Sequence, residues 1–236
     1  MPPEATLRAK VIEIDRRLRP LYRPPEEPPF TDPLDELVLT ILSQNTNDRN
    51  RDLAFRRLRE RFPSWEAVRD APLDAVIEAI RPAGLAQTKG PRLQEVLRRI
   101  TEREGRLTLD FLRTMPLEEA RAWLTSLRGV GPKTAAIVLL FSLGRPAFPV
   151  DTHIHRVSKR LGLIGPKTSR EAAHKVLEAI VPPERYVPFH LELIAHGRQR
   201  CRARRPRCTA CPLLDLCPWG QQQSEAAHDE ETKSTD

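Results

Sequence analysis

The sequence has no apolar run close to the roughly 20 residues that a membrane-spanning helix requires. Its first residues, Met-Pro-Pro-Glu-Ala, also lack the basic and then apolar pattern of a secretory signal peptide. We therefore expect an intracellular, cytoplasmic protein with no membrane partner. In that reducing setting, the four cysteines are not expected to form structural disulfides.

The sequence also lacks any stretch that alternates apolar and polar residues for long enough to predict a sheet. Apolar residues instead recur at three- and four-residue spacing, as at Leu7, Val11, Ile14 and Leu18. We therefore expect an all-α fold. The predicted helices span residues 4–19, 34–42, 48–61, 65–70, 73–80, 90–104, 117–127, 133–143, 152–161, 169–180 and 188–196.

Two segments are not expected to be helical. The segment from Pro20 to Pro33 contains six prolines, counting both ends. Pro20 should therefore end the first helix, and the segment should form an extended connector. Residues 221–236 contain no large apolar side chain, which predicts a disordered tail. Asn47 or Thr46 is expected to cap the helix that begins at Asp48.

The chain has a surplus of positive charge, with 39 Lys and Arg against 32 Asp and Glu and a net charge of +7. Such a surplus indicates an anionic partner, most often nucleic acid, although a basic surface without a specific partner remains an alternative. The location favours a partner, because six of the ten residues from Arg198 to Arg207 are arginine.

Two glycines, Gly129 and Gly131, immediately precede an apolar helical run. Glycine permits backbone conformations in which amides point together at an anion, and the free N–H groups at a helix start also favour a phosphate. Pro132 suits the first helical position. Lys133 then lies in the first turn, where the positive helix end favours a neutral, nucleophilic amine. From the residues alone, a surface lysine in a DNA-binding hairpin is the simpler interpretation.

All four cysteines lie in one window of 17 residues, with the spacing C-x6-C-x2-C-x5-C. This concentration indicates a metal centre, and the spacing alone leaves both structural zinc and an iron–sulfur cluster open. In either case, the ends of the loop from Arg202 to Arg207 are held by two of the cysteines. A loop held in this way can present its four arginines to phosphates. The ligand candidates are Cys201, Cys208, Cys211 and Cys217.

Together, these motifs resemble the endonuclease III family of helix-hairpin-helix DNA glycosylases. One part of the resemblance is LRGVGPKTAAIVL followed by PVDTHIHRV, and the other is the cysteine loop preceded by HGRQRC. The resemblance extends from about Leu34 to Cys217. It implies a [4Fe–4S] cluster on the four cysteines, duplex DNA with damaged bases or abasic sites as the partner, a monomer, and association with the nucleoid.

The resemblance also implies roles for individual residues. Lys133 matches the family's nucleophile, and Asp151 matches its essential aspartate. Gln44 matches the side chain that fills the gap left by a flipped base, and Leu85 matches a second intercalating side chain. The DNA-contacting residues are then Gln44, Leu85, Gly129, Gly131, Arg202, Arg204 and Arg205. From the residues alone, Asp151 is about equally well explained as the N-cap of the next helix.

The family's architecture implies two domains with a DNA cleft between them. Residues 24–145 would form a six-helix barrel domain that contains the helix-hairpin-helix at about residues 117–143. Residues 1–23 and 146–220 would form the iron–sulfur cluster domain. Two departures bear on substrate preference: Asn45 and Asn47 differ from the usual S-A-Q-A-T-D pattern around Gln44, and Pro132 replaces a common basic residue.

The function implied by the resemblance is a bifunctional DNA glycosylase and AP lyase of base excision repair that removes oxidised pyrimidines. The alternatives are a monofunctional mismatch glycosylase and a non-catalytic DNA-binding protein. Lys133 argues against the monofunctional enzyme, because relatives of that type lack a lysine at this position.

Overall fold

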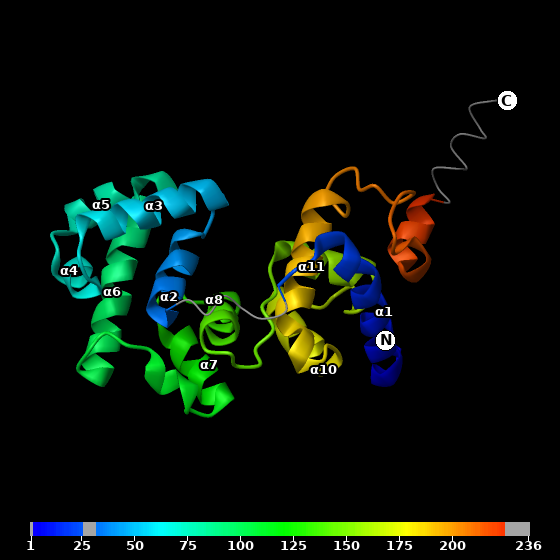
Figure 1. Ribbon diagram of the computed structural model, residues 1–236, viewed down its shortest axis with the longest axis horizontal. Helices are drawn as coiled ribbons and strands as arrows, with labels where there is room; N and C mark the ends of the chain where they lie inside the picture. The colour runs from blue at the N-terminus through cyan, green and yellow to red at the C-terminus, as the bar shows by residue number, and fades with distance from the viewer. Residues whose placement is uncertain (1, 26–31, 225–236) are drawn as a thin grey trace. The chain divides into compact units, whose positions relative to one another are not determined.

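The computed structural model describes residues 2–25 and 32–224, and within these ranges the regular elements are helices and no strand occurs (Figure 1). The predicted all-α fold is confirmed. The chain divides into two compact units, which we call the hairpin unit and the cysteine unit. The hairpin unit is Pro29–Pro146, and the cysteine unit is Met1–Pro28 together with Ala147–Asp236.

The hairpin unit contains most of the short helices. Helix α6 (Ala86–Glu104) packs against α4 (Trp65–Asp70) and α5 (Leu73–Ile80), while α2 (Pro33–Leu42) packs against α3, α6 and α8. Four apolar side chains of α2 are fully buried: Leu37, Val38, Ile41 and Leu42. The remaining elements are α3 (Asp48–Arg61), η1 (Arg81–Ala83), η2 (Asp110–Arg113), α7 (Leu117–Ser126), α8 (Pro132–Ile137) and the π-helical η3 (Val138–Ser142).

The cysteine unit combines the first helix of the chain with helices from its C-terminal half. Helix α1 (Glu4–Tyr22) packs on α10 (Arg170–Ile180) and α11 (Tyr186–Gln199), as Figure 1 also shows. The apolar positions expected on α1 face this contact, because Leu7, Val11, Ile14 and Leu18 are buried. The unit also contains α9 (Thr152–Arg160), which packs on α11, and η4 (Pro183–Arg185), η5 (Leu214–Leu216) and helical residues 218–224.

Many of these helices start after a residue whose polar side chain caps the first turn. The Asn47 side chain accepts a hydrogen bond from the Asn50 amide at 2.9 Å, which confirms the expected cap of α3. Ser64, Asp32 and Ser169 cap α4, α2 and α10 in the same way. These caps satisfy amides that would otherwise lack partners at helix starts.

Several predicted boundaries are wrong, including both ends of the helix predicted at 188–196, which is observed as Tyr186–Gln199. Pro20 does not end α1, because it lies in the last turn and the helix continues to Tyr22. Helix α6 begins at Ala86, four residues before the predicted start at Gly90. Gly90 lies inside the helix, where its lack of a side chain allows close packing against Ile77 of α5. The apolar run after Pro132 is α-helical only to Ile137 and continues as a π-helix, a form that sequence periodicity does not reveal.

The tail and the connector fall only partly within the described residues. Residues 221–224, expected to be disordered, continue a helix from residue 218, and the Ser224 hydroxyl donates to the Gly220 carbonyl. The rest of the predicted disordered tail and the central part of the proline-rich connector lie outside the described residues.

Candidate active site and cysteine pocket

The hairpin between α7 and α8 is built on two glycines with different requirements. Gly129 has a φ of +82°, a conformation that favours glycine, and a Cβ added there would displace the Arg92 side chain, whose Cδ would lie 2.1 Å away. Gly131 has an ordinary φ of −95°, and an added Cβ would meet no atom within 4 Å. The open space beside Gly131 leaves room for a ligand to approach the backbone closely.

Gln44 lies on this hairpin. Its Nε2 donates to the Gly129 carbonyl at 2.9 Å, and its Oε1 accepts from Arg92 Nη1 at 3.1 Å. Helix α2 ends just before it, at Leu42, and the next residue, Asn45, has a φ of +53°. The structure therefore brings two of the predicted DNA-contacting residues, Gln44 and Gly129, into direct contact.

Leu85 stands exposed at the start of α6. Its side chain is 57% exposed, and its backbone is left-handed with a φ of +51°. Such a conformation is strained for a bulky residue, and an exposed leucine gains nothing from the core. Both features are unfavourable for folding alone and favour a role in contacting a ligand.

Lys133 is the second residue of α8 and is exposed, whereas the next three residues of the helix are buried. The helix therefore anchors its apolar side in the hairpin unit and leaves the lysine amine accessible. Asp151 belongs to the cysteine unit. Its pairing with Lys133 stays a prediction.

Asp151 caps α9. Its Oδ1 accepts from the Ile154 amide at 2.7 Å, so the capping interpretation is confirmed. The segment before it is fixed by two buried histidines, because His174 Nδ1 donates to the Phe148 carbonyl at 2.9 Å and His190 Nδ1 donates to the Pro149 carbonyl at 3.0 Å. The carboxylate is thus held on a rigid segment, and its remaining oxygen lone pairs leave room for a second role.

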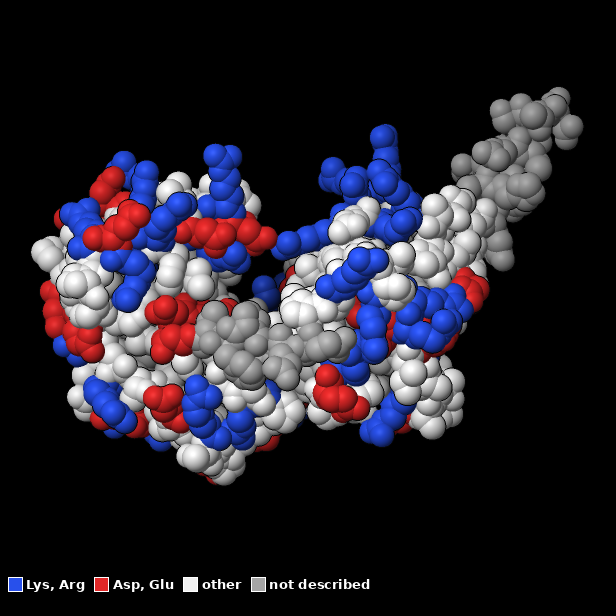
Figure 2. All heavy atoms as spheres, in the orientation of Figure 1, with Lys and Arg blue, Asp and Glu red and all other residues white. Residues whose placement is uncertain are grey.

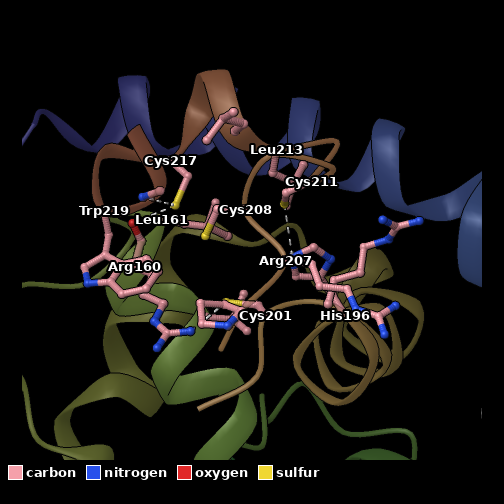
Figure 3. A pocket seen from close by; sticks show the side chains of 15 residues that line it. Arg160, Leu161, His196, Cys201, Arg207, Cys208, Cys211, Leu213, Cys217 and Trp219 are labelled. Atoms are coloured by element: carbon pink, nitrogen blue, oxygen red, sulfur yellow. Dashed lines mark hydrogen bonds between the residues drawn. The ribbon is translucent and has the colours of Figure 1, made fainter. Parts of the chain in front are cut away.

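The four cysteines line one pocket together with residues of α9 and α11 (Figure 3). Burial raises the pKa of Cys208, Cys211 and Cys217, and the charge of neighbouring thiolates raises it further. The raised pKa values keep these thiols protonated, so four thiolates in this pocket would require a compensating positive charge. Within the described residues, no three His, Cys, Asp or Glu side chains converge closely enough to hold a single metal ion.

Hydrogen-bond donors surround the sulfurs. Arg160 Nη1 donates to Cys201 Sγ at 3.3 Å, and the Gly220 amide donates to Cys217 Sγ at the same distance. The Arg160 guanidinium also lies 3.9 Å from the centre of the Trp219 ring. Donors of this kind stabilise thiolates that bind a metal centre.

His196 forms a further contact with the sulfurs. Burial and the charge of Arg200 lower its pKa to about 4, so the imidazole is neutral. Its Nδ1 lies 3.1 Å from the Tyr22 hydroxyl and its Nε2 lies 3.7 Å from Cys211 Sγ. The Tyr22 hydroxyl and the Cys211 sulfur thus each contact one nitrogen of the neutral ring.

The arginine loop follows α11. Arg202, Arg204 and Arg205 are exposed, and basic side chains stand over the end of α11 and the chain after it in Figures 1 and 2. The loop is fixed by its backbone, because the Arg202 and Arg207 amides both donate to the Arg200 carbonyl. By contrast, acidic residues are mixed with the arginines of α3, where Arg51 pairs with Asp48 and Asp52.

Comparison with known proteins identifies the family of the chain. Residues 38–183 match the model of the HhH-GPD superfamily of base excision DNA repair proteins. Endonuclease III of Haemophilus influenzae is 34% identical over 213 residues, which are 90% of this chain and 96% of that protein. The chain belongs to the endonuclease III family of this superfamily. It is a DNA glycosylase of base excision repair, and the resemblance stated above is confirmed.

Two further matches extend the comparison, one with a plant protein and one with a solved structure. A protein of Arabidopsis thaliana is 38% identical over 165 residues, and the match covers 70% of this chain but only 56% of that protein. The solved structure of a trapped endonuclease III–DNA covalent intermediate matches with a TM-score of 0.78 and 30% identity. That match covers 95% of this chain and all of the other.

Family membership suggests a metal cluster for the cysteine pocket, and the residues present fit one. Four sulfurs face the pocket, donors surround them, and their mutual repulsion calls for a cation. Within the described residues, no helix of this glycosylase is long and apolar enough to cross a membrane.

The structure adds residues to the glycosylase site that sequence reasoning missed. Arg92 contacts Gln44 and occupies the space beside Gly129, and Lys89 lies buried behind the same loops. Arg156 and Arg160 join α9 to the cysteine loop, since Arg156 Nε donates to the Cys201 carbonyl at 3.0 Å. Nothing in their local sequence distinguishes these residues from other basic residues on helices.

Proposed function

We propose that this glycosylase is bifunctional, with both base-removing and AP lyase activity, and that its substrates are oxidised pyrimidines in duplex DNA. The observation that carries the proposal is Lys133, an exposed lysine directly after the hairpin at the position of the family's nucleophile. The lesion class rests on the similarity to endonuclease III proteins.

The reaction begins with extrusion of the damaged nucleotide, because C1′ of a stacked nucleotide is shielded from attack. The hairpin amides at Gly129 and Gly131 hold a backbone phosphate. Gln44 leaves its contact with the hairpin and fills the space of the extruded base, while Leu85 enters the stack beside it. The arginines of the 202–207 loop bind phosphates elsewhere on the duplex.

The chemistry is carried by Lys133 and Asp151. The Lys133 amine attacks C1′, the bond from C1′ to the base breaks, and the base leaves with the bonding electron pair and a proton. Asp151 accepts a proton from the lysine and stabilises the positive charge that develops on the sugar. Opening of the sugar ring gives a Schiff base, and β-elimination then breaks the C3′–O bond on the 3′ side of the lesion.

The four cysteines would hold a [4Fe–4S] cluster, which matches the family's spacing. When bound, the cluster supplies the positive charge that four thiolates require and closes the loop ends at Cys201 and Cys208. The protein itself holds this loop through Arg156 and Arg160. A visible absorption spectrum with iron and zinc analysis of the purified protein tests the identity of the metal centre.

Borohydride trapping on abasic duplex DNA tests the lysine directly. The parent protein should form a covalent adduct and Lys133→Gln should form none. Lys167→Gln, which removes another exposed lysine, is the matched control and should trap like the parent. An adduct with Lys133→Gln would contradict the assignment.

Lesion preference needs a separate measurement. Base release from duplexes with an oxidised thymine should exceed release from duplexes with an oxidised guanine or a mismatched adenine. Base release without strand cleavage would instead identify a monofunctional enzyme. Tight binding without any base release would identify a DNA-binding protein.

A further inference from the structure

The loops that carry Gln44 and Leu85 share an unusual backbone feature. Each turns through a residue other than glycine in the left-handed region, at Asn45 with a φ of +53° and at Leu85 with a φ of +51°. Asparagine adopts this conformation readily, but for the bulky Leu85 it is strained and persists only where surrounding structure enforces it. Something in the hairpin unit must therefore hold the Leu85 loop in place.

Lys89 of α6 meets this requirement. Its side chain is 1% exposed, and its Nζ donates to the Leu42 carbonyl at 2.7 Å and to the Ala83 carbonyl at 2.9 Å. Leu42 is the last residue of α2 and Ala83 is the last residue of η1, so each carbonyl lies two residues before a predicted DNA-contacting side chain.

The backbone of the same residue adds a third contact. The Lys89 amide donates to the Leu85 carbonyl at 2.9 Å. One residue thus contacts both sides of the Leu85 turn and the end of the helix before Gln44. A single side chain fixes the distance between the two loops.

Stability alone does not account for a lysine at this position. Burial, together with the charge of Arg92, lowers the pKa of Lys89 to about 8, which reflects the cost of placing an ammonium in the interior. An apolar side chain of similar volume often stabilises a fold as well as or better than a buried charge.

We propose that Lys89 is a positioning residue that sets the spacing of the Gln44 and Leu85 loops, so that both side chains enter the DNA stack together. The proposal rests on the proposed function of these two residues. It predicts that Lys89 matters for removal of a stacked base and much less for cleavage at an abasic site, where no base has to be extruded.

The same helix offers a matched control. Gln94 is also buried, and its Nε2 donates to the Val68 carbonyl at 3.0 Å and to the Ala71 carbonyl at 2.8 Å. It therefore holds two carbonyls at the end of α4, as Lys89 holds two at the ends of α2 and η1. Neither of its partners precedes a predicted DNA-contacting residue.

The experiment compares Lys89→Met with Gln94→Met in the full-length protein. Each variant is measured for single-turnover base release from a damaged duplex and for strand cleavage at a pre-formed abasic site. Lys89→Met should lower base release about tenfold or more, because small misplacements of positioning groups have large effects on rate. Its abasic cleavage should change by less than about threefold, and Gln94→Met should leave the ratio of the two rates unchanged.

The outcomes separate the inference from the proposed function. If Lys89→Met keeps the parental ratio, or if Gln94→Met shifts it equally, Lys89 is structural and the positioning role is wrong. If the parent protein itself neither releases bases nor cleaves abasic sites, the proposed function fails, and that result is independent of the variants.

A second measurement needs no activity. Hydrogen exchange should increase in the 43–47 and 84–88 segments of Lys89→Met and stay unchanged there in Gln94→Met. If Lys89→Met does not fold, Lys89→Gln retains one donor in the site and is measured in its place. Parental exchange in both segments of the folded variant would overturn the proposal.

Discussion

The two units hold their proposed DNA-directed residues by different means. In the hairpin unit, Gln44 and Leu85 lie on loops that Lys89 fixes through hydrogen bonds to two backbone carbonyls, while Arg92 donates to the Gln44 side chain. In the cysteine unit, the exposed arginines lie on a loop that begins and ends at proposed metal ligands. The first arrangement is complete within the polypeptide, whereas the second combines contacts from Arg156 and Arg160 with the proposed metal centre.

This difference predicts how the structure of each unit should respond when one of its contacts is removed. Loss of a hydrogen bond in the hairpin unit should misplace one loop and leave the helices intact. Loss of a ligand in the cysteine unit should loosen the segment from Cys201 to Cys217, because η5 is its one short regular element and its other contacts are single hydrogen bonds and ion pairs, such as those from Arg160 and Arg17. In such a segment, the free energy of metal binding contributes directly to the free energy of folding.

The largest effect is expected from Cys217→Ser, which removes the most buried of the four thiols. Trypsin should then cleave the variant at the arginines of the 202–207 loop, while the hairpin unit keeps its parental resistance. Digestion followed by mass spectrometry measures this, and visible absorption follows the cluster. Thr209→Ser, exposed between Cys208 and Cys211, should change neither result. Equal digestion of both units would show that they do not differ in this way.

Asp151→Asn should separate the two roles of that residue. Asparagine caps a helix about as well as aspartate, so the free energy of unfolding should change by less than about 0.5 kcal/mol. Base release should fall roughly 100-fold, the lower limit for loss of a general base. Asp151→Ala should lose both activity and about 1 kcal/mol of stability, since it leaves the Ile154 amide without its cap. Full activity of Asp151→Asn would leave only the capping role.

Local signals explain why much of the fold was predictable. Helix starts carry caps such as Asn47, Ser64 and Asp151, and apolar spacing along α1 agrees with the buried face that the structure shows. Both depend on neighbours within four residues. The π-helix at Val138–Ser142 was missed because its residues are equally compatible with an α-helix.

The site could be predicted only where it repeats a family motif. Lys89 was missed because its partners, the carbonyls of Leu42 and Ala83, are chosen by tertiary packing and leave no mark in the sequence around it. The predicted helix 90–104 also left Lys89 outside α6, whereas α6 begins at Ala86. The contact between Gln44 and Gly129 joins residues 85 positions apart and was hidden for the same reason.

Alanine substitutions at the two hairpin glycines separate stability from DNA binding in the hairpin unit. Gly129→Ala should cost roughly 1–2 kcal/mol for its positive φ, plus the displacement of Arg92, and it should release Gln44. Gly131→Ala should leave stability unchanged, because nothing lies near the added methyl group, but it should weaken DNA binding where a phosphate approaches. Thermal unfolding and binding to an undamaged duplex measure the two effects. Unchanged binding by Gly131→Ala would mean that no phosphate lies there.

The smallest effect concerns a buried carboxyl group in the cysteine unit. Glu192 of α11 is fully buried beside Asp15, with Arg19 and Arg185 also near, and burial followed by the Asp15 charge raises its pKa well above the usual range. The folded state therefore retains a proton that the unfolded chain loses near its ordinary pKa, so stability falls as pH rises through this interval. Glu192→Gln cannot ionise, and it should match the parent at pH 4 and exceed it at pH 8 by on the order of 1 kcal/mol. Denaturant unfolding at the two pH values measures this difference. A difference independent of pH would show that Glu192 is ionised in the folded protein and that Arg185 compensates its charge.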